Sequence, residues 1–167
     1  MRPMPVWYHE TYTEGISRSA RFPRDRYRML RERLNDLHGT GLICIESPEP
    51  VVRDTLLIAH EQDYLDRFLS GSLDTKEVRR IGLEPWTGAF LPRTMRIIGG
   101  AVEALAHVTR FGGIAANMAG GTHHSHRSFG SGYCVFNDLA ICALLGRDEH
   151  GCERIAVLDL DVHQGDG

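Results

Sequence analysis

The chain has 167 residues, of which 42% are hydrophobic and 25% are charged, and its formal net charge is −3. This length and apolar content are sufficient for a single domain over residues 1–167 with its own core. The small negative charge gives no electrostatic basis for binding nucleic acid or an anionic membrane. No apolar run approaches the roughly 20 residues of a membrane span, and we recognise no signal peptide.

The cysteine content bears on the cellular compartment. The four cysteines are Cys44, Cys134, Cys142 and Cys152. They form no C-x-x-C pair, which predicts reduced thiols and a cytoplasmic location. Cys134 lies inside a glycine-rich motif, where a small buried packing residue is favoured over a nucleophile.

Short apolar runs and one amphipathic stretch alternate along the N-terminal third of the chain. They predict a strand over residues 6–9, a helix over residues 24–37 and a second strand over residues 41–46. The helix is rich in arginine, but Glu32 and Asp36 interrupt its positive charge. A solvated helix face is therefore favoured over a nucleic-acid surface.

Capping signals predict the helices in the middle of the chain. Asp54 is expected to cap a short helix, and a second helix is expected over residues 63–69. Residues 82–92 are expected to form a loop. Thr94 is then expected to cap a helix that continues to Arg110.

The last third of the chain has the order strand, helix, strand. Residues 114–119 predict a buried strand, and Asn137 or Asp138 begins a helix to about residue 147. The apolar run that starts at Ile155 predicts a buried parallel strand. Successive units of this kind imply right-handed parallel crossovers, so the expected fold is a three-layer α/β domain with a mostly parallel sheet.

Polar residues gather where the last apolar run ends. They are Asp159, Asp161, His163 and Asp166. The first three share strand parity, so in a continuing strand their side chains project to one side. Ligands collect at the carboxyl ends of parallel strands, and a carboxylate with an imidazole suits a divalent ion such as Zn²⁺. The alternative is a loop of solvated carboxylates and helix caps.

A cluster of histidines lies upstream between glycine-rich turns. His123 and His124 are adjacent, and loops of this composition bring imidazoles into a site. A histidine pair on the surface without a role is the alternative. His126 has no evident partner in the sequence and is expected to have no chemical role.

Three segments, GGTHH, GSGYCVFND and DLDVHQGDG, follow one another along the chain. In this order and at this separation they resemble the histone deacetylase family, which includes acetylpolyamine amidohydrolases and acetoin-utilisation proteins. The upstream segments, AHEQDYLDRFLSG and LPRTMRIIGGAVEAL among them, are most similar to the class IV branch and its bacterial relatives. The resemblance extends from about Val6 to Gly167 and implies the arginase-like version of the three-layer fold.

The resemblance implies roles for the polar residues of both clusters. Asp161 and His163 match two of the family's three metal ligands. His123 and His124 match its pair of catalytic imidazoles. The implied reaction is hydrolysis of an N-acetyl amide by a metal-activated water, with one histidine as base and a histidine returning a proton to the leaving amine.

The neighbouring residues match supporting positions of the family. Asp159 matches the buried carboxylate that orients the first histidine, and Asp166 matches the one that orients the second. A carboxylate that accepts one ring N–H fixes the tautomer and raises the basicity of the other nitrogen. Gly132 and Tyr133 match the wall of the narrow acyl-lysine tunnel, where the family more often has phenylalanine than tyrosine.

The cofactor implied by the resemblance is Zn²⁺, and an Asp and His set also tolerates Fe²⁺ or Mn²⁺. A monovalent cation such as K⁺ is implied beside the strand that carries Asp159 and Asp161. The family's third metal ligand, an aspartate, and its oxyanion-stabilising tyrosine lie in a C-terminal half that this sequence does not match. We therefore expect a C-terminally truncated domain with weak metal binding and no deacetylase activity by itself.

The substrate and two alternative functions stay open at this point. The amine released is that of a protein lysine, a polyamine or another small molecule. One alternative is a non-catalytic fragment with a binding or regulatory role. The other is a calcineurin-like metallophosphoesterase, because Asp161-Val162-His163 also fits the first metal motif of that class. GGTHH and GYCVFND have no place in a metallophosphoesterase, which favours the deacetylase interpretation.

Overall fold

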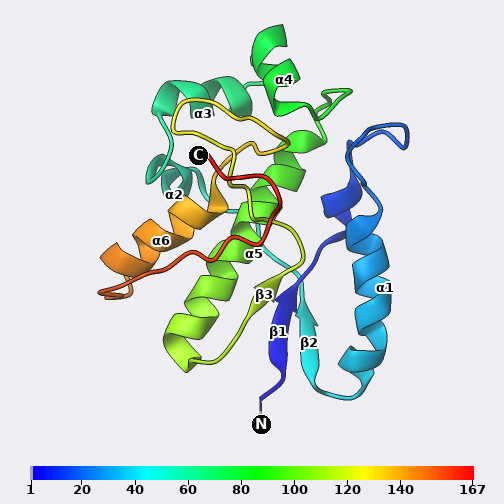
Figure 1. The fold of residues 1–167 in the computed structure, drawn as a ribbon, viewed down its shortest axis with the longest axis vertical. Helices are drawn as coiled ribbons and strands as arrows, with labels where there is room; N and C mark the ends of the chain where they lie inside the picture. The colour runs from blue at the N-terminus through cyan, green and yellow to red at the C-terminus, as the bar shows by residue number, and fades with distance from the viewer. Residues whose placement is uncertain (1) are drawn as a thin grey trace. The chain divides into compact units, whose positions relative to one another are not determined.

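The computed structural model describes residues 2–167, and Figure 1 shows their elements in chain order. The chain divides into two compact units. The first unit runs to Val51 and resumes over Pro85–Gly120, and the second unit comprises Val52–Glu84 and Gly121–Gly167. The described residues contain no helix that is both long and apolar enough to cross a membrane.

The first unit holds a parallel sheet of three strands in the order β2-β1-β3. They are β1 (Met4–Trp7), β2 (Ile43–Glu46) and β3 (Ala116–Asn117). Val6 of β1 pairs with Ile45 on one side and with Ala116 on the other. The predicted α/β class is confirmed. β3 is shorter than expected because Ile114 is 73% exposed and only two residues pair with β1.

The helical elements of the first unit are η1 (Glu10–Thr13), α1 (Arg26–Gly39) and α5 (Phe90–Phe111). The expectation that Thr94 caps the long helix is wrong, because α5 begins four residues earlier and Thr94 is buried within it. Pro92 lies in the first turn of α5, where a proline is tolerated. Trp86 stacks on Phe90, with ring centroids 4.9 Å apart, and anchors the preceding loop.

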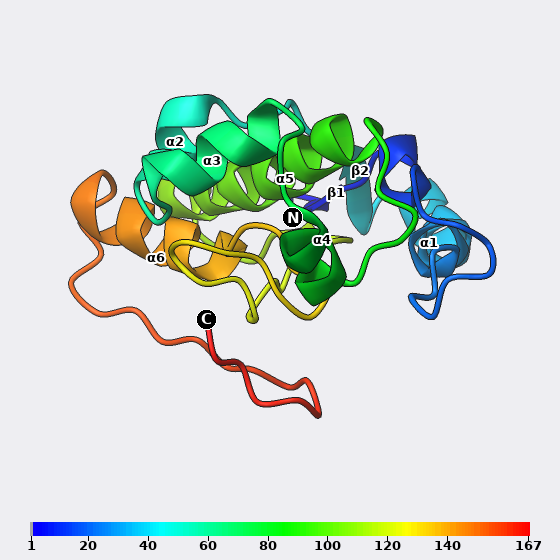
Figure 2. The ribbon, with the colours of Figure 1, turned by 90° about the horizontal axis from the view of Figure 1, so that it is seen from above.

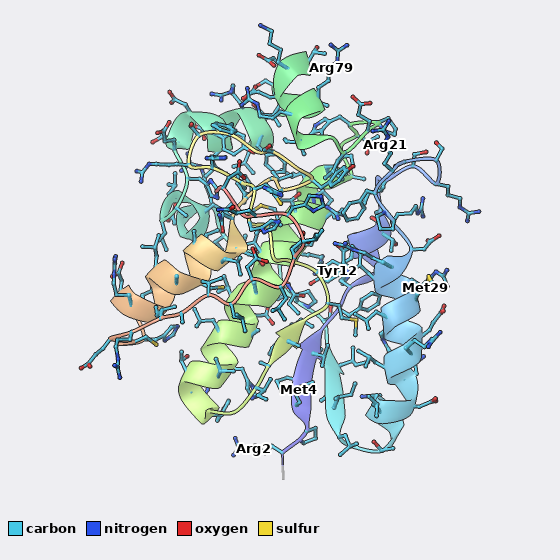
Figure 3. The ribbon with its side chains drawn as sticks, viewed as in Figure 1. Arg2, Met4, Tyr12, Arg21, Met29 and Arg79 are labelled. Atoms are coloured by element: carbon cyan, nitrogen blue, oxygen red, sulfur yellow. The ribbon has the colours of Figure 1, made fainter. Side chains whose placement is uncertain are left out.

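The core of the first unit forms where α5 meets η1 and β3. The Tyr12 hydroxyl donates to the Asn117 side chain over 2.8 Å, and the Asn117 amide donates to the Ile97 carbonyl over 2.8 Å. Figure 3 labels Tyr12 beside α5, whereas Met29, on α1, is 54% exposed. A polar network that is satisfied in this way can be buried without a desolvation penalty on orphaned groups.

Gly99 lets a second segment lie directly against α5. A Cβ atom at this position would be 1.9 Å from the Glu49 carbonyl oxygen. The Arg96 guanidinium donates to the Pro48 carbonyl over 2.6 Å, and the Val51 N–H donates to the Met95 carbonyl over 3.0 Å. The segment after β2 is thus held against the helix by its backbone, and only a residue without a side chain fits beneath it.

The second unit contains α2 (Arg53–Leu57), α3 (Gln62–Leu69), α4 (Thr75–Ile81) and α6 (Asp138–Asp148). The predicted helices near residues 63–69 and 138–147 are confirmed, and Asn137 caps α6 by accepting from the Ala140 N–H. Asp54 does not cap α2. The N-cap is Val52, so Asp54 lies in the first turn, where a carboxylate interacts favourably with the helix dipole.

Helix α4 was not predicted, although its N-terminal signal is present in the sequence. Asp74 accepts from the N–H groups of Lys76 and Glu77, and the Glu77 carboxylate accepts from the Asp74 N–H. This reciprocal arrangement is a capping box. The helix ends at Ile81, and its C-cap is Gly82, which has a φ of 78°.

The prediction of a buried strand from Ile155 onward is wrong. Residues after Gly151 form no strand, and Figure 2 draws them as a loop trace. Leu158, Leu160 and Val162 are 83%, 85% and 93% exposed. A strand requires a neighbour that pairs with its backbone, and the described residues supply no such ladder to this segment.

Candidate active site

The loop that carries the histidine pair is fixed by Asp138, the first residue of α6. Its carboxylate accepts from the N–H groups of Gly121 and Thr122, over 2.9 and 2.8 Å, and from the Thr122 hydroxyl over 2.5 Å. The Thr122 hydroxyl in turn accepts from the Asp138 N–H. Asp138 is 4% exposed, so these bonds replace water around a buried carboxylate. The start of α6 therefore sets the backbone immediately before His123.

The other side of the loop is held by Ser125 and Asn137. The Ser125 hydroxyl donates to the Val135 carbonyl over 2.7 Å, and the Asn137 amide donates to the Ser125 carbonyl over 3.0 Å. All of these groups are buried. Bonds on both flanks leave His123 and His124 on a short segment whose backbone has little freedom.

The two adjacent imidazoles each contact one carboxylate of the C-terminal segment. His123 Nδ1 lies 2.6 Å from Asp159 Oδ2, and His124 Nδ1 lies 2.7 Å from Asp166 Oδ1. The two rings are close, with centroids 4.1 Å apart. Backbone contacts join the same segments, because the N–H groups of Asp166 and Gly167 donate to the His123 carbonyl over 3.2 and 2.9 Å. The structure thus brings together both pairs that the sequence matched to family positions.

The carboxylates of the two pairs are stabilised in their ionised form. The hydrogen bond to His123 lowers the pKa of Asp159, and the hydrogen bond to His124 lowers the pKa of Asp166. An ionised carboxylate at Nδ1 holds the proton of a neutral imidazole on that nitrogen and leaves Nε2 as a base. The resemblance implied buried carboxylates, which is wrong here. Asp159 and Asp166 are 37% and 62% exposed, because the segment that carries them is not a buried strand.

Asp161 and His163 lie close together, and the Asp161 carboxylate bonds the backbone and the ring of His163. Asp161 Oδ1 accepts from the His163 N–H over 2.8 Å and lies 3.0 Å from His163 Nδ1. The backbone N–H of His163 is the first cause of the lowered pKa of Asp161. A carboxylate and an imidazole are suitable ligands for a divalent metal ion. Across residues 2–167, however, no three His, Cys, Asp or Glu side chains are arranged to hold one.

Gly132 and Tyr133 form a tight turn that rests on the end of α4. The N–H groups of Gly132 and Tyr133 donate to the carbonyls of Arg80 and Ile81, over 3.2 and 2.7 Å. A Cβ atom on Gly132 would be 2.7 Å from the His124 ring. Tyr133 has a φ of 68°, which is strained for a residue with a side chain, and its exposed fraction is 39%. The helix that sequence reasoning missed thus supports the turn beside His124.

Cys134 follows this turn and is a packing residue, as expected. It is 6% exposed, and burial raises the pKa of its thiol to about 11. A thiol that stays protonated at neutral pH is a poor nucleophile. All four cysteines are unpaired.

Two further histidines, His60 and His126, make contacts near the histidine pair that sequence reasoning missed. His60 is 2% exposed, and its Nδ1 lies 3.1 Å from the His126 carbonyl. Its Nε2 accepts from the Asn137 N–H over 2.9 Å. The expectation that His126 lacks a partner is wrong, because its Nε2 lies 3.5 Å from Asp166 Oδ2. Spacing in sequence gave no signal for either contact, since each joins separate loops.

The environment of His60 predicts a loss of stability in acid. Burial lowers the pKa of His60 below its ordinary value of 6.5, and its Nε2 must be unprotonated to accept from Asn137. The unfolded chain takes up this proton below about pH 6.5, whereas the folded chain resists it. We therefore expect the second unit to be fully stabilised above that pH and to lose stability as the pH falls toward 5.

The measurement is amide hydrogen exchange of Leu65, whose N–H donates to the Glu61 carbonyl, and of Asn137 between pH 7 and pH 5, corrected for intrinsic exchange. His60→Gln should flatten the pH dependence of protection. His150→Gln is the control, because His150 is exposed and should leave the dependence unchanged. A pH dependence that survives intact in H60Q would contradict the assignment.

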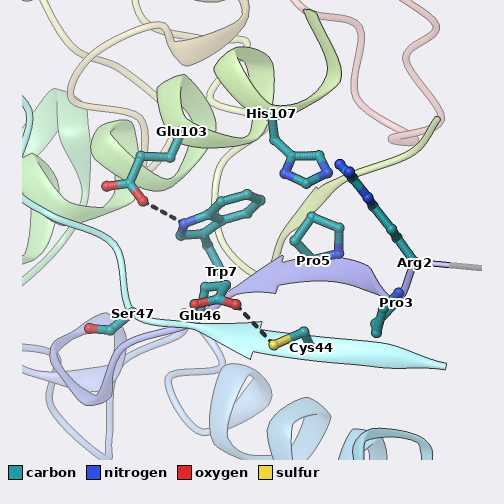
Figure 4. A pocket seen from close by; sticks show the side chains of 9 residues that line it. All are labelled: Arg2, Pro3, Pro5, Trp7, Cys44, Glu46, Ser47, Glu103 and His107. Carbon is teal, nitrogen blue, oxygen red and sulfur yellow. Dashed lines mark hydrogen bonds between the residues drawn. The ribbon is translucent and has the colours of Figure 1, made fainter. Parts of the chain in front are cut away.

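A cavity of about 330 Å³ lies in the first unit and contains none of the predicted site residues. Figure 4 shows Trp7 in its wall, with the indole N–H donating to the Glu103 carboxylate over 2.5 Å. The other Glu103 oxygen accepts from the Glu49 N–H over 2.7 Å, and the Cys44 thiol donates to Glu46 over 2.9 Å. These groups satisfy one another, which favours a structural role.

Comparison with known proteins places the chain in a family. Residues 20–167 match the histone deacetylase domain. The chain is 40% identical to an uncharacterized protein of Picosynechococcus over 98% of its length, and 30% identical to the acetoin utilization protein AcuC of Staphylococcus aureus over 72%. It is 33% identical to the human polyamine deacetylase HDAC10 over 84%. The alignments cover 54%, 34% and 20% of these relatives. The chain therefore belongs to the histone deacetylase family.

Proposed function

We propose that this chain provides the catalytic histidines, with their carboxylate partners, of a metal-dependent amidohydrolase. The enzyme would remove acetyl groups from acetylated lysine or polyamine-type amines. One observation carries the proposal. His123 and His124 each contact a separate ionised carboxylate, and Asp161 and His163 lie on the same short segment as those carboxylates. Family membership supports the same reaction class, and the relative named a polyamine deacetylase supports a polyamine-type amine as one substrate.

The roles of the histidines follow from their partners. Asp159 and Asp166 hold the Nδ1 protons of the two histidines, so each Nε2 atom can exchange a proton with the water or the substrate. One imidazole accepts the proton of the attacking water at Nε2, and an imidazole returns a proton to the leaving amine nitrogen. The C–N amide bond breaks, and acetate and a free amine are the products.

Asp161 and His163 would hold the metal ion, which is Zn²⁺ or, with the same donors, Fe²⁺ or Mn²⁺. When bound, the ion supplies Lewis acidity toward the acetyl oxygen and lowers the pKa of the attacking water. Two protein ligands predict weak binding, so the 167-residue chain by itself is expected to show no turnover. Gly132 and Tyr133 are proposed to form part of the wall of the substrate channel. We further propose that the domain has the three-layer arginase-like fold and that the protein is cytoplasmic.

The test measures acetate release by the product of the complete open reading frame, with the 167-residue chain as a second sample. Substrates are an acetyl-lysine peptide, an N-acetylated polyamine and a phosphodiester. We expect amide hydrolysis by the complete product, and a loss of about 10²–10⁴-fold in kcat in His124→Gln. His150→Gln is the matched control. Phosphodiester hydrolysis without acetate release would replace the proposal with a metallophosphoesterase.

Metal dependence is tested separately on the product of the complete open reading frame. Dialysis against a chelator should abolish acetate release, and Zn²⁺ should restore it. Asp161→Asn and His163→Gln should each raise the concentration of Zn²⁺ needed for half-maximal recovery by at least about tenfold. Asp148→Asn is a control on an exposed carboxylate outside the site. Activity that is unaffected by the chelator would contradict the metal-dependent mechanism.

A further inference from the structure

Asp166 contacts two imidazoles, one with each carboxylate oxygen. Oδ1 lies 2.7 Å from His124 Nδ1, and Oδ2 lies 3.5 Å from His126 Nε2. His124 is one of the proposed catalytic imidazoles, but the proposed reaction gives His126 no task. The carboxylate between them is 62% exposed, and the backbone around it is attached to the loop by the N–H groups of Asp166 and Gly167, which donate to the His123 carbonyl.

His126 is fixed independently of Asp166. Its N–H donates to the Phe129 carbonyl over 2.9 Å, and its own carbonyl lies 3.1 Å from Nδ1 of the buried His60. Its ring stacks on Phe129, with centroids 4.4 Å apart and an interplanar angle of 21°. The Arg80 guanidinium lies 4.5 Å from the centroid of the same Phe129 ring. The loop thus presents His126 Nε2 from a fixed position to an exposed carboxylate on a segment without regular secondary structure.

We infer that His126 is a positioning residue, whose Nε2–H holds Asp166 Oδ2 and so keeps Oδ1 directed at His124 Nδ1. A single hydrogen bond leaves an exposed carboxylate free to turn its second oxygen toward water and to trade its partner for solvent. A second donor at the other oxygen removes that rotation, as the outer partners of a catalytic histidine commonly do. The catalytic consequence, a correctly oriented His124, rests on the proposed function.

The experiment observes the His124–Asp166 hydrogen bond directly in the 15N-labelled 167-residue chain. The readouts are the Nδ1–H resonance of His124, its exchange with water and the ring tautomer from long-range 15N–1H correlations. His126→Phe preserves the stack on Phe129 and removes the donor. His126→Gln restores an amide N–H donor. His150→Phe is the matched control for an exposed histidine elsewhere.

We expect exchange of the His124 Nδ1–H to become about three- to fivefold faster in H126F and to return toward the native rate in H126Q. H150F should leave the rate unchanged. In the Asp166→Asn background, H126F should have no further effect, because the carboxylate that links the two rings is gone. Native backbone chemical shifts at Phe129 and Val135 establish that the loop is intact. If H126F does not fold, H126M is compared with H126Q in its place.

A native His124 Nδ1–H signal and exchange rate in folded H126F would overturn the inference. So would an effect of H126F that persists unchanged in the D166N background. Neither readout requires turnover. Failure of the complete protein to release acetate would therefore refute the proposed function without affecting this result, and an unresponsive His124 would refute only the role of His126.

Discussion

Gly99→Ala is expected to lower the free energy of unfolding of the first unit by about 3 kcal/mol. The added Cβ atom would stand 1.9 Å from the Glu49 carbonyl oxygen, which is backbone and cannot rotate aside. The segment that follows β2 must move off α5, and the bonds from Arg96 and Val51 then lengthen. Because domains of this size are stable by only about 5–15 kcal/mol, the loss is a large fraction of the total.

Urea unfolding monitored by tryptophan fluorescence measures this effect, because Trp7 and Trp86 both belong to the first unit. Gly39→Ala is the matched control. A Cβ atom on Gly39, the last residue of α1, meets nothing within 4 Å. We expect G39A to be neutral or to stabilise by about 0.4–1 kcal/mol through the unfolded state. Equal midpoints for G99A and G39A would contradict the close packing of α5.

Asp138→Asn is expected to cost about 2–3 kcal/mol in the second unit, although it changes only one atom. Every partner of this carboxylate is a donor, namely two N–H groups and one hydroxyl. An asparagine amide group would face one of these donors with its own N–H groups and leave both unsatisfied. The attachment of the backbone before His123 to α6 would be weakened, although the residue 138 N–H can still donate to the Thr122 hydroxyl.

Hydrogen exchange of the Gly121 and Thr122 amides, together with a urea titration, measures this change. Protection of both amides should fall in D138N by about 30- to 150-fold if the loop opens with the lost free energy. Asp148→Asn removes an exposed carboxylate that bonds only Arg147, and it should change neither readout. Unchanged protection in D138N would show that the loop does not depend on this residue.

Local patterns located several elements of the structure. The structure has β1, β2 and the cap of α6 at Asn137 within two residues of the prediction. The α6 cap depends only on neighbouring residues, whereas the apolar runs of β1 and β2 form strands because they pair with each other. The capping box at Asp74 carried equally local information for α4. The sequence therefore contains the signal for this helix, although the helix was not predicted.

The remaining errors have a tertiary origin. The run from Ile155 has the composition of a buried strand, but composition cannot provide the neighbouring strand that pairs with it. The pairs of His123 with Asp159 and His124 with Asp166 were reached through family motifs, since each joins residues far apart in the sequence. The contact of His126 with Asp166 joins two loops that are distant in sequence and depends on the tertiary fold, so no local pattern predicts it.

The irregular course of the chain between Asp148 and Asp159 makes that segment a tether. It presents the carboxylates to the imidazoles at an effective concentration set by its length and stiffness. The contact between each imidazole ring and its carboxylate is therefore an intramolecular binding equilibrium. Because such an effective concentration falls only slowly with loop length, residues inserted after Gly151 would weaken the pairing gradually rather than abolish it.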